Sequence, residues 1–191
     1  MKTKGKIYMY SLLIMMVFGT LASCDKSDIP EIPEHHLDVD FCYELTCSET
    51  LLKYVTPEVT FTDANGAQSV VSIESDMWEG GEHKTWKQTV HYDSLNVSNT
   101  ATVRYVPRTG VTYQDESDFE SVHNLTCLIS IKEDGDGRRN NYTIIPETPS
   151  QKTTVTAAAL ESFISKLSNS SLTRGGSIDM KGEIKKIEIE N

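Results

Sequence analysis

The sequence has few basic side chains for its length. Its 191 residues carry 18 Lys and Arg against 28 Asp and Glu, which gives a net charge of −10 at pH 7 with histidine neutral. A chain of this charge is repelled by nucleic acid and by bare anionic lipid. The composition therefore predicts no nucleic-acid partner and no direct binding to anionic lipid.

Several catalytic motifs are missing as well. The sequence has no Gly-x-Ser-x-Gly, no His-Glu-x-x-His, no glycine-rich phosphate loop and no Cys-x-x-Cys. We therefore expect neither enzymatic activity nor a cofactor. An enzyme that acts on glycan or peptide is the less favoured alternative.

Two short stretches hint at metal binding but do not supply a full ligand set. His35 and His36 are adjacent in a proline-containing segment, without further ligands nearby. Asp134-Gly135-Asp136-Gly137 begins like a calcium loop, but the twelfth position counted from Asp134 is Ile145, where such a loop needs a bidentate Glu. We expect a solvated linker and a hairpin turn at these places, and no metal.

The apolar run of the chain lies at its N-terminus. Residues 7–18 are almost wholly apolar and follow Lys2, Lys4 and Lys6. The run is too short to span a bilayer, which takes about twenty residues. It leads to the small residues of Leu21-Ala22-Ser23-Cys24, as a secretory signal does. The pattern predicts a signal peptide over residues 1–23.

Leu21-Ala22-Ser23-Cys24 closely resembles the lipobox of bacterial lipoproteins. The resemblance implies cleavage before Cys24 and acylation of its thiol and its new amino group; several acyl chains hold a protein on a membrane stably, whereas one does not. Residues 25–28, Asp-Lys-Ser-Asp, are similar to the acidic surface-export signals of Bacteroidetes lipoproteins, although an ordinary tether has the same composition. We expect an outer-membrane anchor, with the head facing either the exterior or the periplasm.

A flexible tether is predicted between the anchor and the head. Residues 24–37 contain acidic side chains together with Pro30 and Pro33, which stiffen the chain toward an extended form. From Asp38 the pattern changes to strict alternation of apolar and polar residues. We therefore predict one domain over residues 38–191, long enough to form its own core.

The alternation predicts a series of strands and one helix. A helical period appears only near the C-terminus, where Thr154 or Thr156 can cap a helix that ends near Ser168. The parity of Ile187 and Ile189 departs from that of Ile184, which predicts a bulge within one last strand. The expected strands cover residues 38–47, 55–62, 68–75, 82–92, 101–105, 125–131, 142–145 and about 177–189.

Short strands that follow one another without intervening helices favour antiparallel sheets. We therefore expect a mainly β protein, an immunoglobulin-like two-sheet sandwich with one C-terminal helix and a final strand. A lipocalin-like closed barrel is the alternative. The Gly-x-Trp signature of lipocalins is missing, since no tryptophan precedes Trp78.

Three cysteines remain once Cys24 is assigned to lipid. An exported protein can form disulfides, but Cys42 and Cys47 lie five residues apart in one expected strand, roughly 16 Å. Cys47 and Cys127 both fall on the apolar parity of their strands. They are a candidate disulfide; two buried free thiols are the alternative.

Two further residues are candidates for modification or binding. Asp93-Ser94-Leu95 matches the pattern that Bacteroidetes use for O-glycosylation of exported proteins. The resemblance implies a glycan on Ser94, and an unmodified turn is the alternative. Trp78 lies in a glycine-rich loop and is a candidate ligand contact, because an exposed indole can stack on a sugar. Strand parity places Trp86 in the core.

As a whole, lipobox, acidic tether and a single β-rich domain resemble the small lipoproteins of Bacteroidetes. The resemblance implies a membrane-anchored protein of the cell envelope. The anchor, the sandwich pattern and the missing catalytic motifs favour a non-catalytic binding or interaction module as its head. A structural or assembly accessory of an outer-membrane complex is the alternative. The expected partners are the membrane, through lipid on Cys24, and a glycan or an envelope protein.

Overall fold

The computed structural model describes residues 37–133, 142–144 and 151–191. These residues belong to one compact unit, His35–Asn191, which contains every described strand and the whole described core. The predicted signal peptide, Cys24, most of the tether and the turn at Asp134 lie outside the described residues. Within the described part, no helix combines the length and apolar character needed to cross a bilayer.

One sheet is built around the long first strand. Its strand order is β4-β1-β7-β8, and all its pairs are antiparallel. Every second residue of β1 is buried, from Val39 to Cys47, because the alternating sequence directs one face of the strand inward. The strands are β1 (Leu37–Ser48), β4 (His83–Tyr92), β7 (His123–Glu133) and β8 (Tyr142–Ile144).

The second sheet has the order β11-β10-β5-β2-β3 and is also antiparallel. Its central strand β5 buries Ala101, Val103 and Tyr105 and directs Thr100, Thr102 and Arg104 to the other face. The strands are β2 (Val55–Thr62), β3 (Gln68–Ser72), β5 (Val97–Pro107), β10 (Ser171–Ile178) and β11 (Ile184–Glu190).

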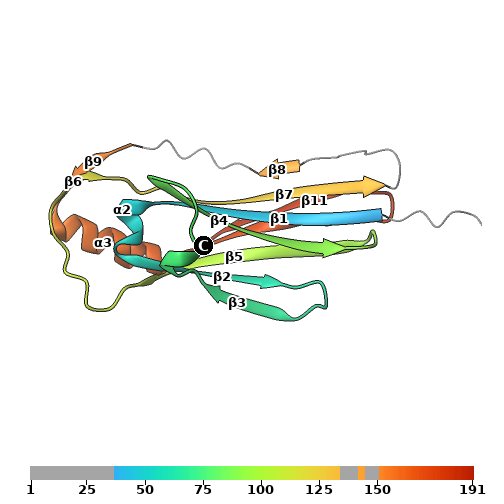
Figure 1. The fold of residues 1–191 in the computed structure, drawn as a ribbon, viewed down its shortest axis with the longest axis horizontal. Helices are drawn as coiled ribbons and strands as arrows, with labels where there is room; N and C mark the ends of the chain where they lie inside the picture. The colour runs from blue at the N-terminus through green and yellow to red at the C-terminus, as the bar shows by residue number, and fades with distance from the viewer. Residues whose placement is uncertain (1–36, 134–141, 145–150) are drawn as a thin grey trace, which may run out of the picture. The chain divides into compact units, whose positions relative to one another are not determined.

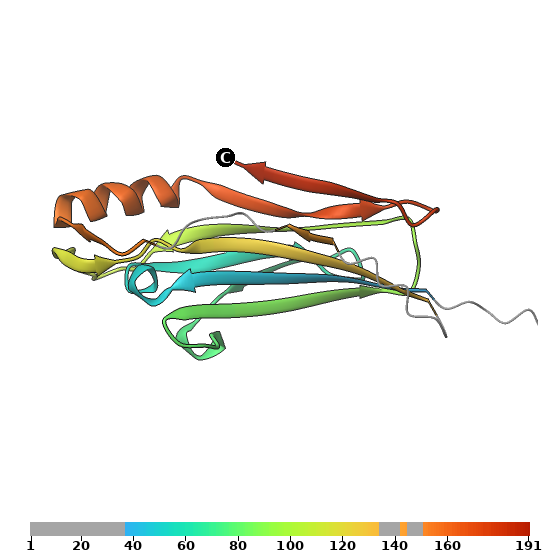
Figure 2. The same ribbon diagram turned by 90° about the horizontal axis from the view of Figure 1, so that it is seen from above.

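The buried faces of the two sheets pack on one another and form a single hydrophobic core. The expected antiparallel β-sandwich is confirmed (Figure 1, Figure 2). Its strand order differs from the ABED and CFG sheets of immunoglobulin domains. The lipocalin alternative is wrong for the described residues, because their strands form separate open sheets rather than one closed sheet.

A helix and a small third sheet lie at one end of the sandwich (Figure 1, Figure 2). Helix α3 (Ala157–Ser168) follows Thr156, whose hydroxyl accepts a hydrogen bond from the amide of Ala159, as the sequence predicts. The third sheet pairs β6 (Glu116–Phe119) with β9 (Thr153–Val155), and neither strand is predicted by alternation. Two short helices, α2 (Glu49–Leu52) and η2 (Ser75–Met77), complete the described fold.

The C-terminal prediction needs one correction. The region expected to be one bulged strand is a hairpin, in which β10 and β11 are antiparallel neighbours. The carboxylate of Asp179 accepts hydrogen bonds from the amides of Lys181 and Glu183 and so closes the turn. The change of parity lies within β11, between Ile184 and Ile187, where the pairing with β10 is regular, so Ile187 and Ile189 simply face the side of the sheet opposite to Ile184.

The two sheets are also joined by a buried polar group. Asn99, on β5, is 2% exposed, and its side-chain oxygen accepts a hydrogen bond of 2.8 Å from the Tyr43 hydroxyl on β1. Its side-chain nitrogen donates to the Thr62 carbonyl oxygen at 2.7 Å and to the Tyr92 hydroxyl at 2.6 Å. All the hydrogen-bonding groups of this amide are thus paired, which makes its burial tolerable.

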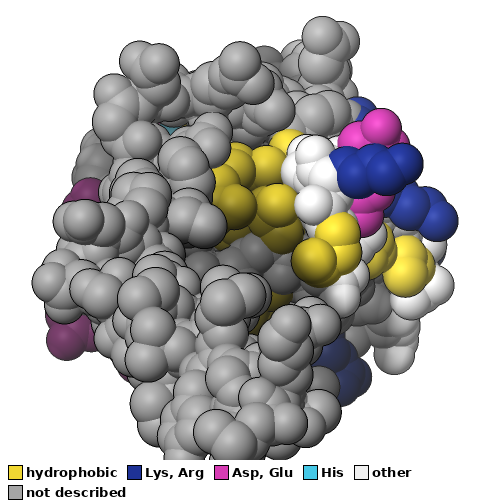
Figure 3. Space-filling view, turned by 90° about the vertical axis from the view of Figure 1, so that its right-hand side faces the viewer, with side chains coloured by type: hydrophobic (Ala, Val, Ile, Leu, Met, Phe, Trp, Pro, Cys, Tyr) yellow, Lys and Arg dark blue, Asp and Glu magenta, His cyan; other side chains and the backbone are white. Residues whose placement is uncertain are grey.

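The end of the sandwich opposite α3 is formed by the start of β1 and by the β4–β5 and β10–β11 turns. Figure 3 faces this end, where hydrophobic side chains lie beside a group of basic and acidic ones. Met180, in the β10–β11 turn, is 73% exposed. This end therefore presents apolar surface as well as charge.

Candidate functional site

The segment that contains Trp78 crosses from one sheet to the other. It leaves β3, passes through η2 and pairs with the free edge of β4. The amide of Glu79 donates to the Thr85 carbonyl oxygen at 2.9 Å, and the amide of Thr85 donates back to Glu79 at 2.8 Å. This reciprocal pair fixes Glu79 beside the first residues of β4.

A glycine makes this crossing possible. Gly80 has a φ of +95°, a backbone conformation that residues with a side chain rarely adopt. A Cβ atom at Gly80 would also lie 2.7 Å from the carbonyl oxygen of His83. A glycine at position 80 is therefore required for the tight reversal, and the reversal in turn positions Glu79.

A shallow depression of about 330 Å³ opens where this segment meets β4. Its volume is at the lower end of the roughly 300–1,000 Å³ range of small-molecule sites. We call it the β4-edge depression, and it is lined by Met77, Glu79, Thr85, Trp86 and Lys87. The lining combines apolar side chains with a carboxylate, a hydroxyl and an ammonium group.

The ammonium group of the depression is held by a neighbouring strand. Lys87 Nζ lies 3.0 Å from a carboxylate oxygen of Glu44 on β1. The hydrogen bond to Glu44, the Coulomb attraction of the same group and the weaker attraction of Glu79 raise the pKa of Lys87. The depression therefore offers a fixed positive charge close to the negative charge of Glu79.

Trp78, the predicted ligand contact, lies next to two lining residues but is not itself part of the lining. Its side chain is half-buried and packs against the core. The indole N–H is buried and has no hydrogen-bond partner among the described residues. An unpaired buried donor of this kind costs about 1–3 kcal/mol. Trp86 belongs to the core, as predicted, with 5% of its surface exposed.

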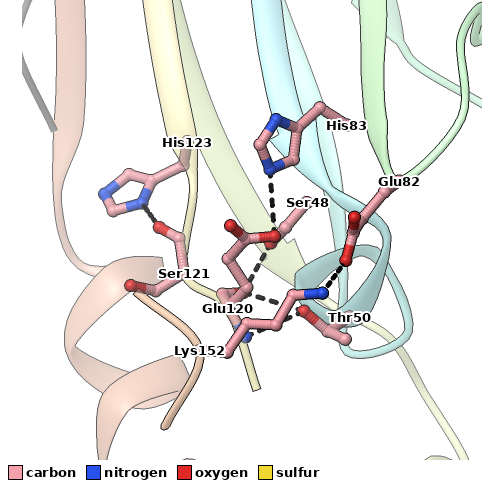
Figure 4. Close-up of polar contacts among 8 residues, drawn as sticks. All are labelled: Ser48, Thr50, Glu82, His83, Glu120, Ser121, His123 and Lys152. Atoms are coloured by element: carbon pink, nitrogen blue, oxygen red, sulfur yellow. Dashed lines mark hydrogen bonds and ion pairs between the residues drawn. The ribbon is translucent and has the colours of Figure 1, made fainter. Parts of the chain in front are cut away.

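A second group of polar side chains joins the end of β1, the start of β4 and the turn before β7 (Figure 4). Glu120 is 2% exposed, and its carboxylate lies 3.0 Å from Nε2 of His83. Ser48 and Thr50 donate hydrogen bonds to the Glu120 carbonyl oxygen at 2.5 and 2.9 Å. The amide of Glu120 donates to the Thr50 hydroxyl at 3.0 Å.

This second group does not form a hydrolytic triad. The Ser48 hydroxyl donates to a backbone carbonyl, so the His83 imidazole is not placed to accept its proton. His123 points away from Glu120 and bonds to the Ser121 carbonyl oxygen at 2.5 Å (Figure 4). A Lys152–Glu82 ion pair lies at the edge of this group of polar side chains (Figure 4). The group therefore ties three segments together.

A third group lies on the outer face of the first sheet. Asp40 bonds to Nδ1 of His91 at 2.8 Å and to Nζ of Lys132 at 3.1 Å. Although partial burial opposes its charge, these two hydrogen bonds hold the pKa of Asp40 below its usual value. The bond to Asp40 raises the pKa of His91. These are surface ion pairs with modest effects on stability.

The candidate disulfide is wrong for this fold. Cys42, Cys47 and Cys127 are free thiols. Cys47 is opposite His123 in the β1–β7 register, and Cys127 is opposite Tyr43. The two sulfurs are therefore displaced by four residues along adjacent strands, about 13 Å, far beyond the reach of a disulfide. Burial raises the pKa of both thiols, that of Cys127 to about 12.

The remaining predicted site residues do not come together in a common site within the described part of the chain. Ser94 is exposed in the turn between β4 and β5, where a modifying enzyme can reach it; its glycosylation stays a prediction. Cys24 lies outside the described residues. Within the described ranges, no group of three or more His, Cys, Asp or Glu side chains is arranged to hold a metal ion. Two acids of the segment before β7 already have hydrogen-bond partners. Asp115 accepts a hydrogen bond from the first amide of α3, and Glu116 accepts one from the Tyr54 hydroxyl.

Part of the depression could be found from the sequence. Alternation in β4 places Thr85 and Lys87 on its polar face. No sequence signal brings Met77 and Glu79 beside them, because that contact depends on the bridge between Glu79 and Thr85. Comparison with known proteins adds no relative: neither a protein-family model, nor a curated protein, nor a solved structure matches the chain.

Proposed function

We propose that the protein is a lipid-anchored lipoprotein of the bacterial cell envelope, and that its β-sandwich head is a non-catalytic binding module for a glycan. The lipobox-like Leu21-Ala22-Ser23-Cys24 supports the anchor. The net charge of −10 supports a head that stands clear of anionic lipid.

The β4-edge depression carries the proposal for the head. Met77, which is 39% exposed, provides an apolar surface for the C–H face of a sugar ring, and Glu79, Thr85 and Lys87 provide partners for its hydroxyl groups. A few polar groups placed around an apolar surface are typical of small-ligand sites. Because the volume is about 330 Å³ and the site is shallow, the ligand is a short segment or the end of a glycan.

The binding claim is tested on a glycan array with the chain from residue 25 onward, which retains the whole compact unit His35–Asn191. We expect binding that Glu79→Gln and Lys87→Met each weaken at least about tenfold, since hydrogen bonds to charged groups contribute about 1.5–3 kcal/mol. Lys132→Met is the matched control, because Lys132 is also exposed and is also paired with an acid of β1, outside the depression. Absence of glycan binding, or equal loss in the control, would show that the proposal is wrong.

The anchor is tested separately in cells. Cys24→Ser should move the protein from the membrane fraction to the soluble fraction, because a chain that carries no acyl groups at position 24 has lost its anchor. Metabolic labelling with a fatty acid should mark the wild-type chain and not the variant. Retention of a signal-cleaved Cys24→Ser chain in the membrane would contradict the lipid assignment.

A further inference from the structure

The outer face of the second sheet has a regular pattern that the proposed glycan site does not use. The register aligns one residue from each of its five strands in a row across the sheet. In strand order, the row is Ile189, Thr173, Thr102, Thr60 and Val70. The Thr102 and Thr173 hydroxyls are hydrogen-bonded to one another at 2.8 Å. We call the outer face of this sheet the threonine face.

One neighbouring row is again uncharged, whereas the other contains two opposite charges. On the side toward Gln68 lie Ile187, Gly175 and Thr100, and on the other side Arg104 and Glu58 are adjacent. The strand parities place three charged residues on the face, of which two are basic: Glu58, Arg104 and Lys185. A chain of net charge −10 thus carries one broad face that is close to neutral.

This face also holds most of the exposed large hydrophobic residues. Of the five described residues of this kind, Val70, Val106 and Ile189 lie on the threonine face, with exposed fractions of 64%, 41% and 47%. The three residues share one face but are separated on it, so each copy offers them singly rather than as one contiguous patch. Val70 and Ile189 stand on the two edge strands, at the opposite ends of the central row.

The side chains of the face fit another sheet better than a sugar. The outward residues of its strands include no Trp, Tyr or Phe, the side chains on which sugar rings stack. Threonine, valine and isoleucine are instead the residues that interdigitate where two sheets pack face to face, about 10 Å apart. The chemistry of the face therefore indicates a protein partner that also presents a β-sheet.

Charge and area point to a second copy of the chain. Two copies of an acidic protein repel one another except where their charges are few or opposite, and the threonine face meets that condition. Five strands with a mean of about eight residues cover roughly 24 by 26 Å, or about 600 Å² in projection, before the corrugation of side chains is counted. This is close to the roughly 800 Å² per partner of a standard interface.

We propose that the threonine face is the interface of a two-fold symmetric dimer in which two sandwiches pack sheet to sheet. Because β5 is the central strand, a two-fold axis parallel to it places β11 of one copy over β3 of the other. Ile189 of each copy then meets Val70 of its partner, and Thr102 lies near the axis. Arg104 and Glu58 of the two copies form a neutral group of four charges.

The test is sedimentation velocity over a concentration series, on the chain from residue 25 onward. We expect a reversible dimer whose dissociation constant rises by on the order of a hundred-fold in Thr102→Lys, because two ammonium groups are then buried near the axis without partners. Thr46→Lys is the matched control: Thr46 is half-buried on the outer face of β1, an inner strand of the other sheet, and the substitution changes the net charge equally. Val70→Lys, at a position 64% exposed, weakens the dimer without risk to folding.

Each result of the sedimentation experiment either supports or overturns the proposed dimer. A dimer that survives Thr46→Lys but is weakened by Thr102→Lys and by Val70→Lys supports the threonine face. A chain that stays monomeric at every concentration overturns the proposal. A dimer that none of the variants weakens, or that Thr46→Lys weakens as much as Thr102→Lys, also overturns it, because association then does not occur through this face. None of these results depends on glycan binding.

Discussion

Removal of the Asn99 side chain tests whether the polar group between the sheets stabilises the sandwich. In the native fold Asn99 accepts from the Tyr43 hydroxyl and donates to the Thr62 carbonyl oxygen and the Tyr92 hydroxyl. Burial raises the pKa of Tyr43 far above its usual range, so its hydroxyl stays protonated and can donate. Asn99→Ala breaks all three hydrogen bonds and leaves the buried Tyr43 hydroxyl without its acceptor.

The magnitude follows from these contacts. A net hydrogen bond contributes about 1 kcal/mol, and a buried polar group left unpaired costs about 1–3 kcal/mol. Tyr92 is half-buried and can turn to water, so the main penalty falls on Tyr43 and Thr62. We expect Asn99→Ala to lower the free energy of unfolding by about 3–5 kcal/mol, a large share of the roughly 5–15 kcal/mol of a typical domain.

Equilibrium urea denaturation of the chain from residue 25 onward measures this loss. Asn65→Ala, in the exposed turn between β2 and β3, is the matched control and should cost less than about 0.5 kcal/mol. Tyr43→Phe alone should cost about 1–2 kcal/mol, and the double variant less than the sum of the two, because the buried Tyr43 hydroxyl is then absent rather than unpaired. A loss below about 1 kcal/mol in Asn99→Ala, or strict additivity in the double variant, would refute the reasoning.

Three further outcomes follow from the described contacts. In folded protein without reductant, a thiol reagent should modify only half-exposed Cys42 among the three head cysteines, and all three after unfolding; a disulfide found by mass spectrometry would contradict the fold. In an NMR titration His91 should show a pKa above the usual value of about 6.5, which Asp40→Asn lowers. The pairing of protonated His91 with Asp40 stabilises the fold at pH values below the unfolded pKa of about 6.5, and this stabilisation is lost as the pH rises through the raised pKa of the folded state. Equal His91 pKa values in the wild type and in Asp40→Asn would refute the pairing. Gly80→Ala should cost about 1–3 kcal/mol and loosen the β4-edge depression, because Ala is strained at this φ and meets the His83 carbonyl; an unchanged thermal midpoint would show that the loop is not constrained.

The fold class could be predicted because the chain alternates so regularly. In β1 and β2 the apolar parity is unbroken, in β5 it is interrupted only by Asn99, and each strand buries the predicted face. Helix α3 is recognisable from the change of period and from the cap at Thr156. The strands that escaped prediction, β6 and β9, are short and mainly exposed, so they carry no apolar pattern to detect.

Pairing between distant strands explains the errors. Cys47 and Cys127 share the buried parity, but parity says nothing of register, and the register separates them by four residues. The parity shift between Ile184 and Ile187 was equally ambiguous between a bulge and a regular strand with apolar residues on both faces. Only the antiparallel pairing of β10 with β11 distinguishes the two.

The sequence by itself determined the antiparallel β architecture, the C-terminal helix α3 and the acidic charge, because these depend on local periodicity and composition. It also carries the lipobox-like pattern on which the proposed anchor rests. The tertiary structure alone decided which side chains meet. It placed Glu79 beside Lys87, buried Asn99 between the sheets and aligned Thr173, Thr102 and Thr60 in one row. Such contacts join residues far apart in the chain, and they are fixed by register and by the crossing of the chain between sheets, which no local pattern encodes.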